Sequence, residues 1–144
     1  MPLARWRETM SLDYPPLDSG HKAFLDVVNS SYMAVQAKDM RAIDNIFKEC
    51  YLYVQTHISH EEKLMEEMNF PQTKEHIQSH QVFISKVAQM KTAFDTAPTH
   101  KDKAQTALHF SNFLSVWLLG HLTTQDKQMK PYLRQLKIKK NRGL

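Results

Sequence analysis

Residues 57–80 read HISHEEKLMEEMNFPQTKEHIQSH, and they carry two ionisable pairs on either side of a turn. His57 and Glu61 precede the Asn-Phe-Pro turn, and His76 and His80 follow it. A spacing of four residues places both members of a pair on one face of a helix. We therefore predict two antiparallel helices, joined at this turn, that aim histidine and carboxylate side chains at each other.

Apolar residues recur at helical spacing in four segments of the chain. The first segment begins near Asp18, a good N-cap residue, and the others begin near Asp39, after Pro71 and near Thr99. Because the connections are short, consecutive helices should be antiparallel neighbours. We expect an all-α protein folded as an up-down-up-down antiparallel four-helix bundle, with a last amphipathic piece beyond Pro131. The predicted core positions include Phe24, Leu25, Val28, Ile43, Phe47, Cys50, Ile58, Ile77, Phe83, Ile84, Val87, Phe94, Phe110, Leu114, Trp117 and Leu118.

The composition is that of one domain without disulfides or membrane spans. The chain has 144 residues, only three glycines and a single cysteine, Cys50, which cannot form an internal disulfide. No apolar run approaches the roughly 20 residues that a membrane span needs, and none follows the N-terminal arginines as in a signal peptide. We expect a cytoplasmic protein that does not insert into membranes.

Basic residues gather at the C-terminus, namely Lys137, Lys139, Lys140 and Arg142. The net charge of +4 is compatible with an acidic partner or nucleic acid. A solvated, frayed end is the simpler interpretation, so nucleic-acid binding is not expected. We expect a bundle domain over residues 1–136 and a short basic tail over residues 137–144.

Seven ionisable residues should fall at one end of such a bundle, on faces where the apolar pattern calls for core residues. A buried carboxylate or unpaired imidazole costs several kcal/mol unless it is paired or binds a metal. Seven donors are too many for one tetrahedral zinc, but they suit two metal ions bridged by carboxylates. Imidazole and carboxylate donors suit iron, zinc or manganese. The candidate ligands are His21, His57, Glu61, His76, His80, His121 and Asp126.

The spacing of His121 and Asp126 does not fit a regular helix. Five residues leave roughly 140° between two side chains on an ideal helix. Both can reach one site only if the helix is widened or broken, and Gly120 and the Thr123-Thr124 pair make a π-bulge there a reasonable expectation. The other three histidines, His60, His100 and His109, do not lie on the ligand faces, and we expect them to be structural or exposed.

These residues resemble the hemerythrin family, in particular its single-domain bacterial members, from Trp6 to about Leu136. The matching positions are residues 17–22, residues 57–62, Met65, Pro71, residues 76–80, residues 117–122 and Asp126. The resemblance implies two non-haem irons, completed by an oxo or hydroxo bridge from solvent. It assigns His76, His80 and His121 to one iron and His21 and His57 to the other, with Glu61 and Asp126 bridging them.

The resemblance also implies reversible O2 binding, at the iron that has only two histidines, in a protein that is not an enzyme. The use would be oxygen storage, delivery or sensing, with O2 and an oxygen-consuming enzyme or signalling protein as partners, and we expect a monomer. Buried carbonyls, Glu62 and Asp18 are candidate acceptors for the outer imidazole nitrogens. Ile58, Gly20 and Met129 depart from common family residues, which affects the expected O2 affinity. An apolar O2 pocket would be lined by Phe24, Leu25, Ile58, Trp117, Leu118 and Leu122.

Three other interpretations remain open. A ferritin-like di-iron oxidase would carry two Glu-x-x-His motifs, and this sequence has none, although weak oxidase or peroxidase chemistry stays an alternative. A sensor module would transmit O2 binding to a partner, and the basic tail is the only obvious output element. A purely structural helical bundle would leave the ionisable cluster without a purpose.

Overall fold

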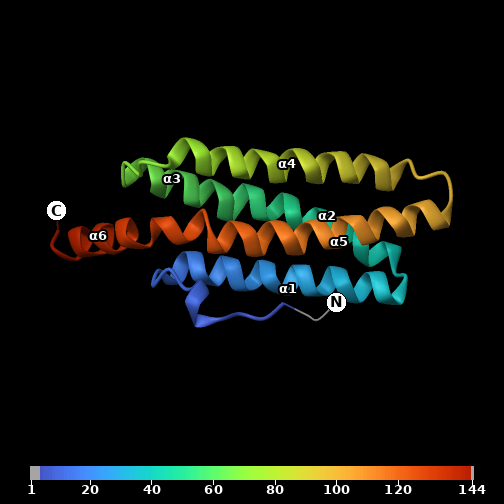
Figure 1. The fold of residues 1–144 in the computed structure, drawn as a ribbon, viewed down its shortest axis with the longest axis horizontal. Helices are drawn as coiled ribbons and strands as arrows, with labels where there is room; N and C mark the ends of the chain where they lie inside the picture. The colour runs from blue at the N-terminus through green and yellow to red at the C-terminus, as the bar shows by residue number, and fades with distance from the viewer. Residues whose placement is uncertain (1–3, 144) are drawn as a thin grey trace.

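The computed structural model describes residues 4–143, and no strand occurs within them. Figure 1 shows helices that lie side by side in alternating directions, as predicted for an antiparallel four-helix bundle. The first bundle helix is α1. The second is a continuous arm made of α2, η2 and α3, the third is α4 and the fourth is α5. The bounds are η1 Glu8–Met10, α1 Pro15–Ala37, α2 Met40–Tyr53, η2 Val54–Ile58, α3 Ser59–Glu67, α4 Thr73–Asp95, α5 His100–Thr123, η3 Asp126–Met129 and α6 Lys130–Asn141.

The helix starts follow from local capping chemistry. The Asp39 carboxylate accepts the backbone N–H of Ala42 at 3.0 Å and begins α2, and the Thr99 hydroxyl does the same for α5. The predicted start of α1 at Asp18 is wrong, because α1 begins three residues earlier at Pro15, whose fixed φ suits a first helical turn. Asp18 instead accepts the backbone N–H of Leu12 at 2.9 Å, which ties the N-terminal segment to α1.

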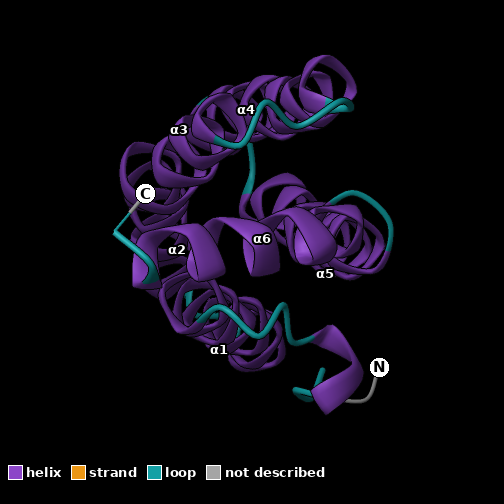
Figure 2. Cartoon of the chain, turned by 90° about the vertical axis from the view of Figure 1, so that its left-hand side faces the viewer, coloured by secondary structure: helices purple, strands orange, loops and turns teal. Residues whose placement is uncertain are grey.

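Two hydrophobic clusters fill the bundle, and a polar layer lies between them. The larger cluster contains Phe47 and Phe110, whose rings stack at 3.8 Å. The smaller cluster includes Leu17, Met65 and Leu133, and α6 closes it by crossing the end of the bundle (Figure 2). On each arm of the bundle, the buried apolar residues on one side of the predicted ligands belong to one cluster and those on the other side belong to the other cluster. The bundle therefore encloses the ionisable residues between two apolar layers.

One of the predicted core residues is exposed. Ile84 is 39% exposed, whereas its neighbour Phe83 is fully buried. Both positions fitted an apolar stripe, but adjacent residues on a helix point about 100° apart, and Phe83 takes the inward direction.

The regular helices are interrupted at two of the predicted ligands. Between His121 and Asp126 the expected break is present, since α5 ends at Thr123 and a 3-10 turn begins at Asp126. The Gly120 carbonyl near the end of α5 accepts both the hydroxyl of Thr124 at 2.7 Å and its backbone N–H at 3.1 Å. The π-helical turn lies instead at η2, around His57.

The C-terminal residues continue α6 rather than fray. This helix runs to Asn141, so the expected division at residues 136 and 137 falls within it, and the domain boundary stays a prediction. No helix within residues 4–143 is both long and apolar enough to cross a membrane.

Candidate metal centre

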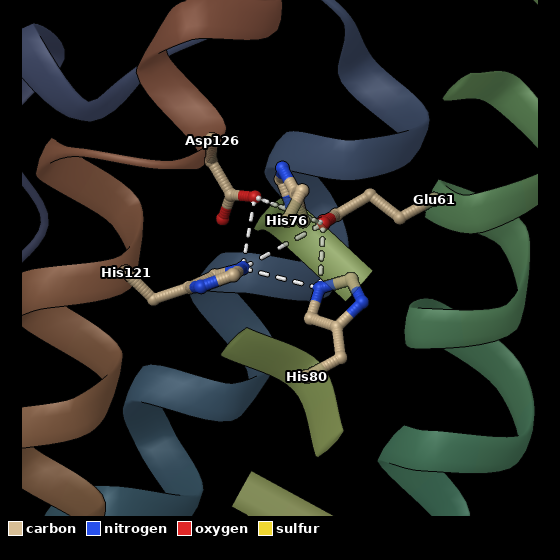
Figure 3. Close-up of side chains that lie close together, drawn as sticks. All are labelled: Glu61, His76, His80, His121 and Asp126. Atoms are coloured by element: carbon tan, nitrogen blue, oxygen red, sulfur yellow. Dashed lines mark hydrogen bonds and ion pairs between the residues drawn. The ribbon is translucent and has the colours of Figure 1, made fainter. Parts of the chain in front are cut away.

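The structure brings all seven candidate ligands together, and all seven are buried, with exposed fractions from 0% to 7%. They come from every arm of the bundle, and Figure 3 shows five of them around a common centre. His60, His100 and His109 are exposed, as predicted. The positions are His21 on α1, His57 on η2, Glu61 on α3, His76 and His80 on α4, His121 on α5 and Asp126 on η3.

The Glu61 carboxylate lies between two sets of imidazoles. Its Oε1 is 2.7 Å from Nε2 of His76 and 3.1 Å from Nε2 of His80. Its Oε2 is 2.9 Å from Nε2 of His57 and 3.2 Å from Nε2 of His21. We call His76, His80 and His121 the three-histidine set, and His21 and His57 the two-histidine set. Each oxygen of Glu61 therefore faces a different set. Figure 3 shows Glu61 beside the three-histidine set.

Asp126 spans the same two sets from the opposite arm of the bundle. Its Oδ1 is 3.0 Å from Nε2 of His76 and 3.2 Å from Nε2 of His121, and its Oδ2 is 3.1 Å from Nε2 of His21. The break between α5 and η3 allows Asp126 to point at both sets, because Asp126 does not continue the regular helix of α5. Both carboxylates thus stand where bridging ligands between two cations would stand.

Protein groups do not satisfy all the buried polar atoms of the centre. Within residues 4–143, no hydrogen bond of good geometry reaches either carboxylate oxygen of Asp126, although both oxygens are buried and have imidazole nitrogens 3.0–3.2 Å away. The Nε2 atoms of His80 and His121 face each other at 3.1 Å, so at least one of them must present a lone pair. Unpaired buried polar atoms cost free energy, and inward-facing nitrogen and oxygen lone pairs are metal donors. The residues present therefore fit non-haem iron.

Two of the outer imidazole nitrogens are hydrogen-bonded. His80 Nδ1 lies 2.8 Å from the Glu62 carboxylate, which confirms Glu62 among the candidate acceptors. His121 Nδ1 lies 2.8 Å from the Ser79 hydroxyl. A neutral imidazole that donates from Nδ1 keeps its Nε2 lone pair free for a metal. The prediction of Asp18 as an acceptor is wrong, because its carboxylate binds the N-terminal segment instead.

Ser79 and Tyr53 were missed by the sequence reasoning. Nothing in the sequence connects Ser79 with His121, since they lie on different helices. Tyr53 stacks on His57 at 4.8 Å and on Phe24 at 4.0 Å. It precedes His57 by four residues, so its helix spacing was a usable signal.

The six residues predicted to line an O2 pocket lie in or against the larger cluster. Five are buried and Trp117 is partly buried. Trp117 stacks on His121 at 4.4 Å and therefore lies beside the three-histidine set. The five buried ones are Phe24, Leu25, Ile58, Leu118 and Leu122.

Opposite charges in the buried layer shift the pKa values of the metal-free centre. Burial alone would lower the pKa of His21, but the carboxylates of Asp126 and Glu61 outweigh it and raise it to about 10. The same balance raises the pKa of His76 to about 9 and raises that of His121. Burial would raise the pKa of Glu61, but hydrogen bonds from the surrounding imidazoles hold it well below its usual range. Without metal, the centre thus retains protons at neutral pH.

Metal loading should therefore release protons. An imidazole binds metal through an unprotonated nitrogen, so loading near neutral pH should release roughly one to three protons per chain and should weaken as the pH falls. Above about pH 10 the release should disappear, because His21 and His76 have already lost these protons. Calorimetry of Zn²⁺ binding in two buffers of different ionisation enthalpy measures the count. The exposed His60→Ala variant should give the same count, and equal heats in both buffers near neutral pH would contradict this expectation.

Comparison with known proteins places this architecture in a family. The family model for the hemerythrin HHE cation binding domain matches residues 13–133. The chain therefore belongs to the hemerythrin family, and the resemblance inferred from ligand spacing is confirmed. It is 27% identical over 139 residues to the bacteriohemerythrin of Stenotrophomonas maltophilia (strain R551-3), covering 94% of this chain and 87% of that protein. It is 26% identical over 121 residues to the bacteriohemerythrin of Pseudomonas aeruginosa (strain UCBPP-PA14), covering 84% and 75%.

Proposed function

We propose that this chain binds O2 reversibly at a carboxylate-bridged pair of non-haem iron ions. The observation that carries the proposal is the division of donors around Glu61, whose two oxygens face sets of three and two imidazoles. Two ferrous ions in these positions would supply the electrons and the vacant coordination position that O2 binding needs. In this proposal the ligands are His76, His80 and His121 at one position, His21 and His57 at the other, and Glu61 and Asp126 between them.

The apolar wall supports reversible binding rather than turnover. Phe24 and Ile58 are each 2% exposed, and Leu118 and Leu122 are sealed still more completely. These side chains belong to the larger apolar cluster, which borders the ionisable layer and excludes water from it, so few protons are available to drive O–O cleavage. The absence of a Glu-x-x-His motif agrees with a binding protein. Oxygen storage or delivery to an oxygen-consuming enzyme follows as the proposed use.

The test is spectroscopic. The purified chain is loaded with Fe(II) without oxygen, exposed to air and then deoxygenated. We expect two irons per chain and a visible charge-transfer band that appears in air and disappears when O2 is removed. The His57→Ala variant should lose the band, whereas His109→Ala should keep it. A band that forms once and never reverses would favour an oxidase instead.

Sensing is the second candidate, and one connection in the fold favours it. Asp126 belongs to η3, which runs directly into α6. A groove along α6 is lined by basic residues, including Lys130, Arg134 and Lys137. A shift of Asp126 would therefore move a charged surface. Hydrogen exchange of α6 with and without O2 tests this, since equal protection in both states would leave storage or delivery as the role.

A further inference from the structure

Gly20 stands at a place where helix physics disfavours glycine. It lies inside α1, directly before His21. Its φ is not positive, since the positive-φ glycine of residues 4–143 is Gly143. A glycine within a helix costs roughly 0.5–1 kcal/mol relative to alanine. Packing must therefore explain why position 20 has no side chain.

The side chain of His57 occupies the space that a Cβ at position 20 would need. A Cβ built on Gly20 would lie 2.7 Å from Cε1 and 3.0 Å from Cγ of His57, and nearer still to Nδ1. Atoms of a rigid imidazole ring cannot give way as the end of a flexible chain can. The His57 ring is also stacked on Tyr53 at an interplanar angle of 12° and lies 4.5 Å from the His21 ring. Any side chain on Gly20 therefore has to displace His57.

The orientation of His57 depends on this packing more than the orientations of His80 and His121 do. His80 and His121 are held from outside by Glu62 and Ser79. The buried Nδ1 atoms of His21 and of His76 have no hydrogen-bond partner within residues 4–143, so in the two-histidine set His21 has no such outer support and in the three-histidine set only His76 lacks it. Within those described residues, the hydrogen bond of His57 joins its Nε2 to the Glu61 carboxylate. Displacing His57 should therefore affect one metal position and spare the other.

We propose that Gly20 is a positioning residue for the two-histidine metal position. The missing side chain lets the His57 ring lie against the α1 backbone with Nε2 directed at Glu61. A methyl group at position 20 moves that nitrogen and selectively empties this position, while the three-histidine position still binds. This inference rests on the metal-binding part of the proposed function and not on its O2 chemistry.

The experiment compares Gly20→Ala with Gly120→Ala. Gly120 is a matched control, because it also lies in a helix beside a candidate ligand, and a Cβ there meets nothing within 4 Å. The metal-free proteins are titrated with Zn²⁺ by calorimetry. We expect two zinc ions per chain for the wild type and Gly120→Ala, and one for Gly20→Ala. Gly20→Ala with two zinc ions at wild-type affinity would overturn the inference, whereas a wild type with fewer than two would overturn the proposed function.

A double-variant cycle tests whether His57 is the cause. Helix propensity alone predicts that both alanine substitutions raise the melting temperature, but Gly20→Ala should lower it in the wild-type background. In a His57→Ala background the obstructing ring is gone, so Gly20→Ala should become stabilising and should not lower the zinc count further. If Gly20→Ala alone does not fold, recovery of folding in the double variant supports the inference. Destabilisation that persists without His57 would refute it.

Discussion

Replacing Glu61 with glutamine should abolish binding at both metal positions. Glu61 is 1% exposed, and its two oxygens approach imidazoles of both sets. Glutamine keeps the shape but removes the negative charge and turns an amide N–H₂ toward one set. Removing one partner of a buried charge cluster costs roughly 3–5 kcal/mol, which corresponds to more than about a hundredfold in affinity. Iron content after loading should fall below one ion per chain, measured by metal analysis.

Glu62→Gln is the control for the Glu61 variant. The two residues are adjacent, but the polar contact of Glu62 within residues 4–143 is with the outer nitrogen of His80, at 2.8 Å. Loss of such an outer hydrogen bond typically weakens a metal site by about 10–100-fold. Glu62→Gln should therefore bind two ions more weakly, while Glu61→Gln binds almost none. If the two variants lose the same amount of iron, Glu61 is not a bridging ligand.

The bundle could be predicted from the sequence because helix periodicity and turn residues are local signals. The starts at Asp39 and Thr99 were predictable because the capping hydrogen bond joins residues only three apart. The start of α1 was predicted too late, because Asp18 is equally suited to a cap and to holding the preceding segment. Which role Asp18 takes is decided by contacts with Leu12 and Ser11 outside the helix.

The convergence of the ligands was predictable for a related reason. Two pairs at helical spacing on either side of one turn are fixed in height and facing by helix geometry alone. The hydrogen bond of Ser79 to His121 was not predictable, since it joins side chains 42 residues apart on different helices. The π turn at His57 was not predicted, because the sequence shows a spacing mismatch only between His121 and Asp126, where the expected break is present. A distortion of one helical turn does not change the apolar periodicity of the sequence, so it cannot be predicted from that pattern.

Removing the metal should lower the melting temperature by tens of degrees. The metal-free bundle must keep two carboxylates and five imidazoles in a layer between two apolar clusters, with no hydrogen bond of good geometry to the Asp126 oxygens. A ligand present at about 1,000 times its Kd stabilises a fold by about 4 kcal/mol, so two ions contribute roughly 8 kcal/mol. For a chain of this length that corresponds to roughly 15–30 °C.

Differential scanning calorimetry of loaded and chelator-treated protein measures the effect of metal removal. Adding Zn²⁺ back should restore most of the lost stability, because zinc accepts nitrogen and oxygen donors alike. Mg²⁺ should restore little, since it prefers an all-oxygen octahedral shell that five imidazoles do not provide. Equal recovery with both cations would mean that charge neutralisation, and not ligation by the histidines, stabilises the centre. A change of only a few degrees on chelation would mean that the buried layer is stable through its own ion pairs.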